Sequence, residues 1–297
     1  MCDRLLERNV SEQSCDDAAT RAARLERDNL QYLSEQLPDC DRPQPFDGAK
    51  PLLSWGDGRK SLFIATEVRC GSTFVAESLA YELHNKFGFH LWDLAKERFA
   101  FLNEDTRPEQ LLSTWRALYL DGSGFVASKF MCKTLSLLHR LARISEDIHD
   151  AFFDEDAYWV VIRRRDRVEQ AASLALAAKT GTFHYYSHVE PAPDRHTRLT
   201  LEEIDWALKA VALSDVYLET FFSSLPRERR VCFYYEDFVR DQIPYLNQIH
   251  ELCGFPRLDA VGYVNMSKLR PNGRDIKSAA SAHFKHWLLE NYAYIIY

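Results

Sequence analysis

From about residue 60 onward, short apolar runs that predict buried strands alternate with stretches of helical periodicity. We expect strands at 61–66, 124–130, 157–162 and 230–234, and helices at 73–87, 134–150, 166–179, 201–222, 241–253 and 277–293. Strands that alternate with helices form βα units. The sequence therefore predicts an α/β fold with a mostly parallel central sheet flanked by helices on both faces.

Residues 1–50 do not follow this pattern. They are highly charged, apolar residues recur at loosely helical spacing from Asp17 to Leu37, and a loop rich in Pro and Gly follows. We interpret residues 1–50 as a helical N-terminal extension and linker, and residues 51–297 as one domain. The extension could be an appendage packed on that domain, which is the simpler interpretation, or a helix that binds a partner. Packing across a two-fold axis would make the protein a homodimer.

Composition excludes several classes of protein. The formal net charge of −7 argues against nucleic acid as the main partner, because nucleic-acid-binding proteins are usually basic. The sequence contains no run of about 18 apolar residues, so we expect no membrane span. The seven cysteines show no CxxC spacing and no secretory leader precedes them, so we expect reduced thiols in a cytoplasmic protein. No His, Cys or Asp cluster has metal-ligand spacing, and we expect no metal.

The first predicted strand runs into the turn Arg69-Cys-Gly-Ser-Thr73, and a helix follows. In parallel sheets ligands bind beyond the carboxyl ends of the strands. The backbone N–H groups of such a turn, the helix dipole and the Arg69 charge would together bind an anion. A nucleotide triphosphatase loop needs GxxxxGK[ST], whereas this turn has one Gly and no Lys. A phosphate-binding turn without a Mg²⁺ site fits better, although an ordinary strand–turn–helix with a Ser/Thr cap also explains the segment.

Glu77 lies one helical turn after Thr73, away from the apolar stripe of the predicted helix. It could face solvent. Alternatively it could look into the space above the turn, where a carboxylate would take a proton from an attacking hydroxyl. A general base must be reachable, so a fully buried or fully solvated Glu77 would count against that role.

The third predicted strand ends in a run of arginines, Arg163-Arg-Arg-Asp-Arg167. Asp166 and Glu169 have capping-box spacing, which predicts a helix start and places Arg165 beside a helix N-terminus. Ser173 follows two turns along that helix. An Arg at the turn and a Ser on the helix can hold one phosphate from two sides, whereas the common alternative for such a run is a solvated charged face.

These residues resemble a known family. Two segments together are similar to the sulfotransferases that use 3′-phosphoadenosine 5′-phosphosulfate (PAPS), especially the bacterial carbohydrate group of the trehalose sulfotransferase type. Arg69 to Leu79 resembles the family's 5′-phosphosulfate loop, and Arg164 to His184 its 3′-phosphate segment. Ser128-Lys-Phe-Met131 and Tyr235-Glu-Asp237 are further, less specific matches. Together the matches span about 61–240.

The resemblance implies a P-loop-like sulfotransferase fold and transfer of a sulfuryl group from PAPS to a carbohydrate hydroxyl, on a glycan or glycolipid. It implies that Glu77 is the general base and that Arg69 stabilises the leaving phosphate, with Lys129 and His184 as other candidates for the base. The residues implied to bind the donor are Arg69, Cys70, Gly71, Ser72, Thr73, Arg165, Ser173, Arg270 and Arg274. We expect Lys129, His184 and Tyr185 to bind the acceptor, because the aromatic and polar side chains around residue 184 could stack on and hydrogen-bond a sugar; a surface loop whose aromatic rings pack into the core explains that segment equally well. Cys70 stands where Ser is common in the family, which removes one hydroxyl.

Two other functions remain open. A small-molecule kinase would need a loop Lys and a Mg²⁺ ligand, and the sequence shows neither. A non-catalytic protein that binds PAPS would keep the fold without transfer, and Cys70 is the feature that favours it.

Overall fold

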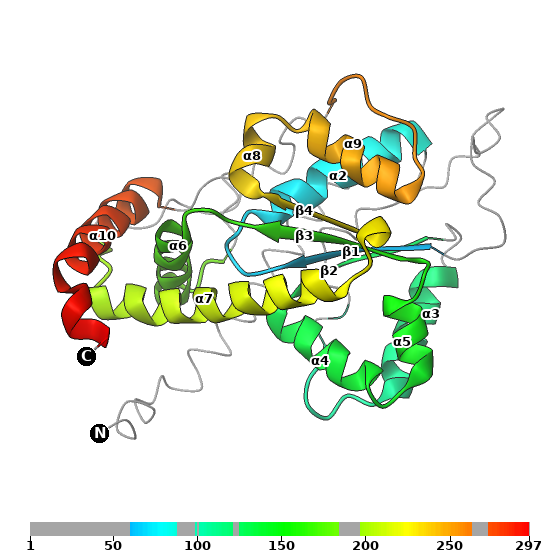
Figure 1. The fold of residues 1–297 in the computed structure, drawn as a ribbon, viewed down its shortest axis with the longest axis horizontal. Coiled ribbons are helices and arrows are strands. Elements are labelled where there is room, and N and C mark those ends of the chain that lie inside the picture. The colour runs from blue at the N-terminus through cyan, green and yellow to red at the C-terminus, as the bar shows by residue number, and fades with distance from the viewer. Residues whose placement is uncertain are drawn as a thin grey trace. The chain divides into compact units, whose positions relative to one another are not determined.

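The computed structural model describes residues 60–87, 99, 101–120, 125–183, 197–262 and 273–296 of the chain (Figure 1). The elements in these residues are, in chain order, β1 (Lys60–Thr66), α2 (Ser72–Phe87), α3 (Pro108–Leu120), β2 (Phe125–Met131), α4 (Cys132–Ala142), α5 (Glu146–Phe153), β3 (Ala157–Arg163), α6 (Arg167–Thr180), α7 (Leu201–Ser224), the 3₁₀ turn η2 (Arg227–Arg229), β4 (Arg230–Tyr234), α8 (Tyr235–Arg240), α9 (Ile243–Cys253) and α10 (Arg274–Ile296).

The strands of the described residues form one parallel sheet in the order β2-β1-β3-β4. This confirms the predicted α/β fold. β1 pairs on both sides, so Thr66 at its end lies opposite Met131 on β2 and Ile162 on β3. Because all strands run the same way, the turns that follow β1, β2 and β3 meet at one edge of the sheet.

Strand side chains alternate between two buried layers. Leu62 and Ile64 of β1 pack with α2, α8 and α9, whereas Phe63 belongs to the layer formed with α3, α4 and α5 (Figure 1). The second layer is rich in aromatic rings. Its Trp159 is fully buried and stacks on Phe153 with ring centroids 5.7 Å apart. Burying each such side chain contributes about 1.5–3 kcal/mol, which anchors the strands whose ends carry the site.

Some helices differ from the sequence prediction. The single helix expected at 134–150 is two helices, because Ser145 caps a new helix by accepting the N–H of Ile148. The helical periodicity of the sequence does not predict α8, which precedes α9, or α3. In α3, Pro108 opens the helix and Glu109 occupies the first turn, which are recognisable start signals.

The chain divides into two compact units. The sheet unit comprises Pro45–Gln170 and Leu208–Asn265, and the helical unit comprises Met1–Gln44, Ala171–Ala207 and Met266–Tyr297. In the helical unit, Gly273 packs so closely on Leu176 of α6 that a Cβ would lie 2.6 Å from its Cδ2 atom. The predicted boundary at residue 50 falls outside the described residues. Among those residues, no helix is long and apolar enough to span a membrane.

Candidate functional site

The loop between β1 and α2, residues 67–71, is a tight turn with two left-handed residues. Arg69 has φ 63° and Gly71 has φ 91°. A side chain at position 71 is excluded, because a Cβ would lie 2.3 Å from the ring of Tyr235 at the start of α8. Arg69 adopts a conformation that costs a non-glycine residue about 1–2 kcal/mol. Strain of this kind often marks a functional site.

Side chains from the segment after β3 hold the β1–α2 loop. Gln170 Nε2 donates to the carbonyl of Val68 at 2.9 Å, and Arg164 Nη1 donates to the carbonyl of Arg69 at 3.0 Å. Gln170 is buried, with 2% of its surface exposed. Two successive carbonyls of the loop are thus fixed by contacts that the sequence analysis missed, since the partners lie far away in the chain.

Cys70 points into the protein. Its side chain is buried and its Sγ atom pairs with Thr66 Oγ1. Burial raises the pKa of the Cys70 thiol, so the thiol stays protonated at neutral pH. A Ser hydroxyl at position 70 would therefore also lie on the inner side of the loop.

Two basic residues belong to this edge of the sheet. Burial, followed by the neighbouring Arg164, lowers the pKa of Arg69 to about 10, which leaves its guanidinium charged at neutral pH. Lys129 on β2 is 2% exposed, and its Nζ atom lies 3.4 Å from Thr73 Oγ1 in the first turn of α2. Arg69 and Lys129, from two neighbouring segments, thus lie near the N-terminus of α2. The helix dipole also favours an anion there.

Glu77 on α2 is buried, with 2% of its surface exposed. Its carboxylate therefore does not face solvent, and that interpretation is wrong. The same burial counts against direct contact between Glu77 and an acceptor, and it favours a role in holding neighbouring groups in place.

Arg165 lies beyond the end of β3, and 56% of its side chain is exposed. Its guanidinium pairs with Asp237 and lies 4.4 Å from the centroid of the Tyr234 ring. The hydrogen bond with Asp237 raises the pKa of Arg165. The backbone N–H of Arg165 donates to both carboxylate oxygens of Glu236 at 3.1 Å. The Arg165 guanidinium thus lies at the surface, where a ligand could reach it, but it is paired with the carboxylate of Asp237.

The predicted helix start after the arginine run is confirmed. Asp166 Oδ1 accepts the N–H of Glu169 at 2.9 Å, as an N-cap should. The other half of the capping box is replaced, because the Glu169 carboxylate pairs with Arg164 at 3.2 Å. Glu236 accepts the N–H of Asp166 instead, at 3.4 Å.

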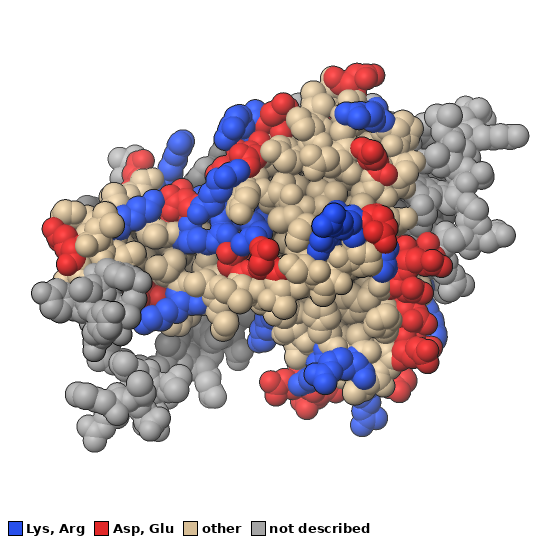
Figure 2. Space-filling model, in the orientation of Figure 1, with Lys and Arg blue, Asp and Glu red and all other residues tan. Residues whose placement is uncertain are grey.

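The arginine run is more than a solvated face. Arg163 binds Asp215 of α7 through Nε and Nη2, both at 2.9 Å, and Arg167 binds the same carboxylate at 2.7 Å. Partial burial alone would raise the pKa of Asp215. The hydrogen bonds from Arg163 and Arg167 outweigh that effect and hold the pKa below its usual value. On the face shown in Figure 2, basic and acidic side chains accordingly lie side by side where β3 ends.

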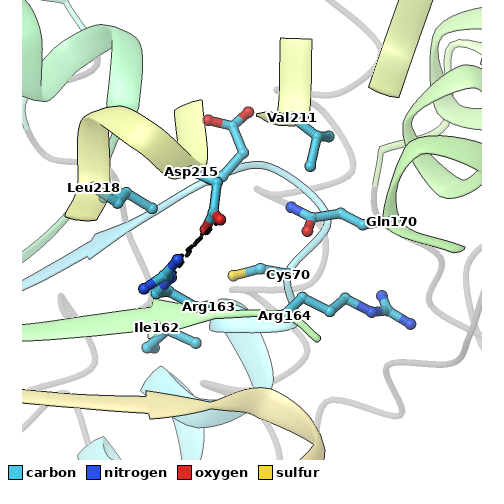
Figure 3. Close-up of a pocket in the computed structure, with 9 residues that line it drawn as sticks. Cys70, Ile162, Arg163, Arg164, Gln170, Val211, Asp215 and Leu218 are labelled. Atoms are coloured by element: carbon cyan, nitrogen blue, oxygen red, sulfur yellow. Dashed lines mark hydrogen bonds and ion pairs between the residues drawn. The ribbon is translucent and has the colours of Figure 1, made fainter. Parts of the chain in front are cut away.

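A small hollow lies between the β1–α2 loop, the end of β3 and α7 (Figure 3). The Arg163–Asp215 pair lies on one side of it and Gln170 on another (Figure 3). Its lining residues are Glu67, Cys70, Ile162, Arg163, Arg164, Gln170, Val211, Asp215 and Leu218.

Of the remaining residues implied by the resemblance, the structure describes two and leaves three outside the described residues. Ser173 lies on α6, in the helical unit, and is buried. Arg274 is the exposed first residue of α10. Arg270, His184 and Tyr185 lie outside the described residues.

No protein-family model matches this sequence, and no curated protein matches it. Among solved structures, a sulfotransferase from Alicyclobacillus acidocaldarius is 17% identical, covers 80% of this chain and 96% of its own, and has a TM-score of 0.43. The sulfotransferase domain of the Synechococcus PCC 7002 olefin synthase is 16% identical over 77% and 90%, with a TM-score of 0.42. A Mycobacterium avium sulfotransferase is 15% identical over 95% and 79%, with a TM-score of 0.41. At these TM-scores, function must be inferred from this chain's own residues.

Proposed function

We propose that this protein is a sulfotransferase that transfers the sulfuryl group of PAPS to a carbohydrate hydroxyl, on a glycan or glycolipid. The observation that carries the proposal is the β1–α2 loop. Left-handed residues at 69 and 71 turn the chain from a buried parallel strand into the N-terminus of a 16-residue helix, next to Arg69 and Lys129. This arrangement suits a bound phosphate or sulfate. It lacks the loop Lys of a nucleotide triphosphatase.

The proposed division of labour follows the charge on the donor. Arg69 and the backbone N–H groups of residues 70–73 bind the 5′-phosphosulfate, and Arg165 binds the 3′-phosphate. The part of Ser173, Arg270 and Arg274 in the 3′-phosphate site is supported by the resemblance alone. In the reaction, the acceptor oxygen bonds to sulfur as the bond from sulfur to the phosphate oxygen breaks. The negative charge then develops on the leaving adenosine 3′,5′-bisphosphate, where Arg69 would stabilise it.

The acceptor hydroxyl must lose a proton, and we propose Glu77 as its acceptor. Support comes from its place on α2, one turn beyond Thr73, and from the family resemblance. Its burial makes a holding role for Glu77 the alternative. The next candidates are Lys129, which reaches Thr73 Oγ1 but is as buried as Glu77, and His184.

The choice of a carbohydrate acceptor is supported by the resemblance, and Lys129, His184 and Tyr185 are the residues that we propose to bind it. A cytoplasmic location and a homodimer built through the N-terminal extension are further proposals. Light scattering of the full chain and of a variant lacking residues 1–37 tests the dimer. A monomer mass for both proteins would exclude it.

Thermal shift measurements test the proposed function. We expect adenosine 3′,5′-bisphosphate to stabilise the protein without Mg²⁺, by about 2.7 kcal/mol at a hundred-fold excess over its Kd. Stabilisation by ATP with Mg²⁺ in preference to the bisphosphate would point to a kinase. Transfer from labelled PAPS to a panel of glycans then separates an enzyme from a binding protein. Bisphosphate binding without transfer to any hydroxyl acceptor would favour the binding protein.

A further inference from the structure

Arg164 contacts all three segments that follow the strands β1, β3 and β4. Its Nη1 donates to the carbonyl of Arg69 at 3.0 Å, and its Nη2 pairs with Glu169 at 3.2 Å. Its Nε lies 3.6 Å from Glu236 Oε1, and its guanidinium carbon lies 5.7 Å from the centroid of the Tyr235 ring. Only 13% of the side chain is exposed. This largely buried cation therefore touches three segments of the sheet edge, although its Nε atom makes no hydrogen bond.

We propose that Arg164 is a positioning residue that sets the conformation of the β1–α2 loop for donor binding, an inference that rests on the proposed function. A trans peptide unit is planar, and its C=O and N–H groups point in opposite directions. The Arg69 carbonyl and the Cys70 N–H belong to the same unit. By holding that carbonyl, Arg164 directs the Cys70 N–H to the other side of the loop. Gln170 does the same for the preceding unit, whose groups are the Val68 carbonyl and the Arg69 N–H.

The hydrogen bond also explains how Arg69 keeps its left-handed backbone. That conformation is unfavourable for a residue with a Cβ, and a charge-assisted bond to its carbonyl offsets the cost. The side chain at 164 must be an arginine for geometric reasons. The guanidinium donates to the Arg69 carbonyl, pairs with Glu169 and lies 3.6 Å from Glu236 without a hydrogen bond from Nε, whereas a single ammonium group does not span these three groups.

The Arg164 contacts also connect the two proposed phosphate sites. Glu236, which lies beside Arg164, accepts the backbone N–H of Arg165. The loop proposed to bind the 5′-phosphosulfate and the turn that carries Arg165 are therefore held by one shared set of side chains. Loss of Arg164 should disturb the loop without removing any group that contacts the 3′-phosphate.

The experiment compares Arg164→Met and Arg164→Lys with the wild-type full chain. A matched control is Arg229→Met. Arg229 Nη1 also donates to a backbone carbonyl, that of Phe153 at 2.8 Å, but near the start of β4 rather than at the carboxyl edge. Two quantities are measured: hydrogen exchange of the amides of residues 69–73, and the Kd values of adenosine 3′,5′-bisphosphate and AMP.

We expect Arg164→Met to speed exchange of these amides about 10-fold and to leave β1 itself protected. Both Kd values should rise about 10-fold, so that their ratio stays constant. Arg164→Lys should restore part of this loss, and Arg229→Met should change neither quantity. Should Arg164→Met fail to fold, Gln170→Met, which removes the bond to the Val68 carbonyl, should show a smaller change in the same direction.

Unchanged exchange in Arg164→Met would overturn the inference. So would a loss confined to the bisphosphate, because Arg164 would then contact the 3′-phosphate itself. Failure of wild type to bind either nucleotide would instead overturn the proposed function, while the exchange measurement would still decide whether Arg164 holds the loop.

Discussion

The β1–α2 loop and the turn after β3 are proposed to bind opposite ends of one donor, yet they are built differently. In the loop, Cys70 is 1% exposed and Gly71 lies under the Tyr235 ring. In the turn, Arg165 is held mainly by Asp237 and the face of Tyr234, at the surface. The loop is therefore held by packed protein groups. If Arg165 binds the 3′-phosphate, its side chain must exchange a carboxylate for a phosphate, so we expect the loop to determine affinity and Arg165 to determine selectivity.

The largest expected effect is on turnover, and it comes from a substitution in α2, the helix that follows the loop. If Glu77 is the general base, Glu77→Gln should lower turnover by about 10²–10⁴ because an amide accepts no proton. Donor affinity should hardly change, since Glu77 adds no positive charge to the phosphate site. Steady-state turnover and the Kd of adenosine 3′,5′-bisphosphate check this.

Glu82→Gln is the matched control for Glu77→Gln. Glu82 is also buried on α2, but its Oε1 accepts the N–H of Gly262 at 2.7 Å, and an amide oxygen can replace it. The control should keep its turnover. Wild-type turnover in Glu77→Gln would exclude the base role and direct attention to His184 and Lys129. Loss of donor binding as well would show that Glu77 holds the loop.

Gly71→Ala should disrupt the packing that holds the loop. The new Cβ would lie 2.3 Å from the Tyr235 ring, on a left-handed backbone. We expect a loss of about 2–4 kcal/mol in the free energy of unfolding and donor binding too weak to measure. Urea unfolding and calorimetry test this prediction.

Gly254→Ala separates strain from steric clash. Gly254 has φ 75°, but a Cβ there would meet nothing within 4 Å, so only about 1 kcal/mol should be lost. Adding Tyr235→Leu to Gly71→Ala should recover part of the stability, as a double-mutant cycle would show. Equal losses in the two alanine variants would mean that the Tyr235 ring does not constrain the loop.

Arg165→Ala should change selectivity with little effect on the loop. Loss of a charge-assisted contact with the 3′-phosphate should reduce the preference for adenosine 3′,5′-bisphosphate over AMP by about 10-fold. The AMP affinity should stay at its wild-type value. If wild type binds both nucleotides equally well, Arg165 does not contact the 3′-phosphate.

The smallest expected effect is that of Asp237→Asn. Arg165 is exposed, and an ion pair with an exposed partner adds little to stability, so the free energy of unfolding should barely change. Bisphosphate binding should tighten by about two- to three-fold, because Arg165 would no longer have to leave a carboxylate. Asp237 also pairs with Arg240 at 3.2 Å, so Arg240→Met is the control and should leave binding unchanged. Weaker binding in Asp237→Asn would show that Asp237 orients Arg165 for the phosphate.

The sequence was informative where structure depends on neighbouring residues. The strand at 230–234 and the cap at Asp166 were predicted because apolar runs and capping side chains act within a few residues. Local patterns do not show contacts between distant segments, such as the Tyr235 ring over Gly71 or the inward turn of Cys70. The burial of Glu77 was not foreseen for the same reason, since helical periodicity identified one apolar stripe and α2 is covered on other sides too.

The central place of β1 in the sheet has a consequence for how the chain folds. β1 is synthesised before both of its partner strands, and the side chains that hold its loop follow 95 residues after Arg69 and 102 residues after Val68. Such long-range pairings form slowly, because a large loop must close before any contact stabilises it. During synthesis, the apolar strand β1 therefore stays unpaired until its partner strands have been made. A nascent chain that ends before Gln170 cannot yet have both of the hydrogen bonds that hold this loop.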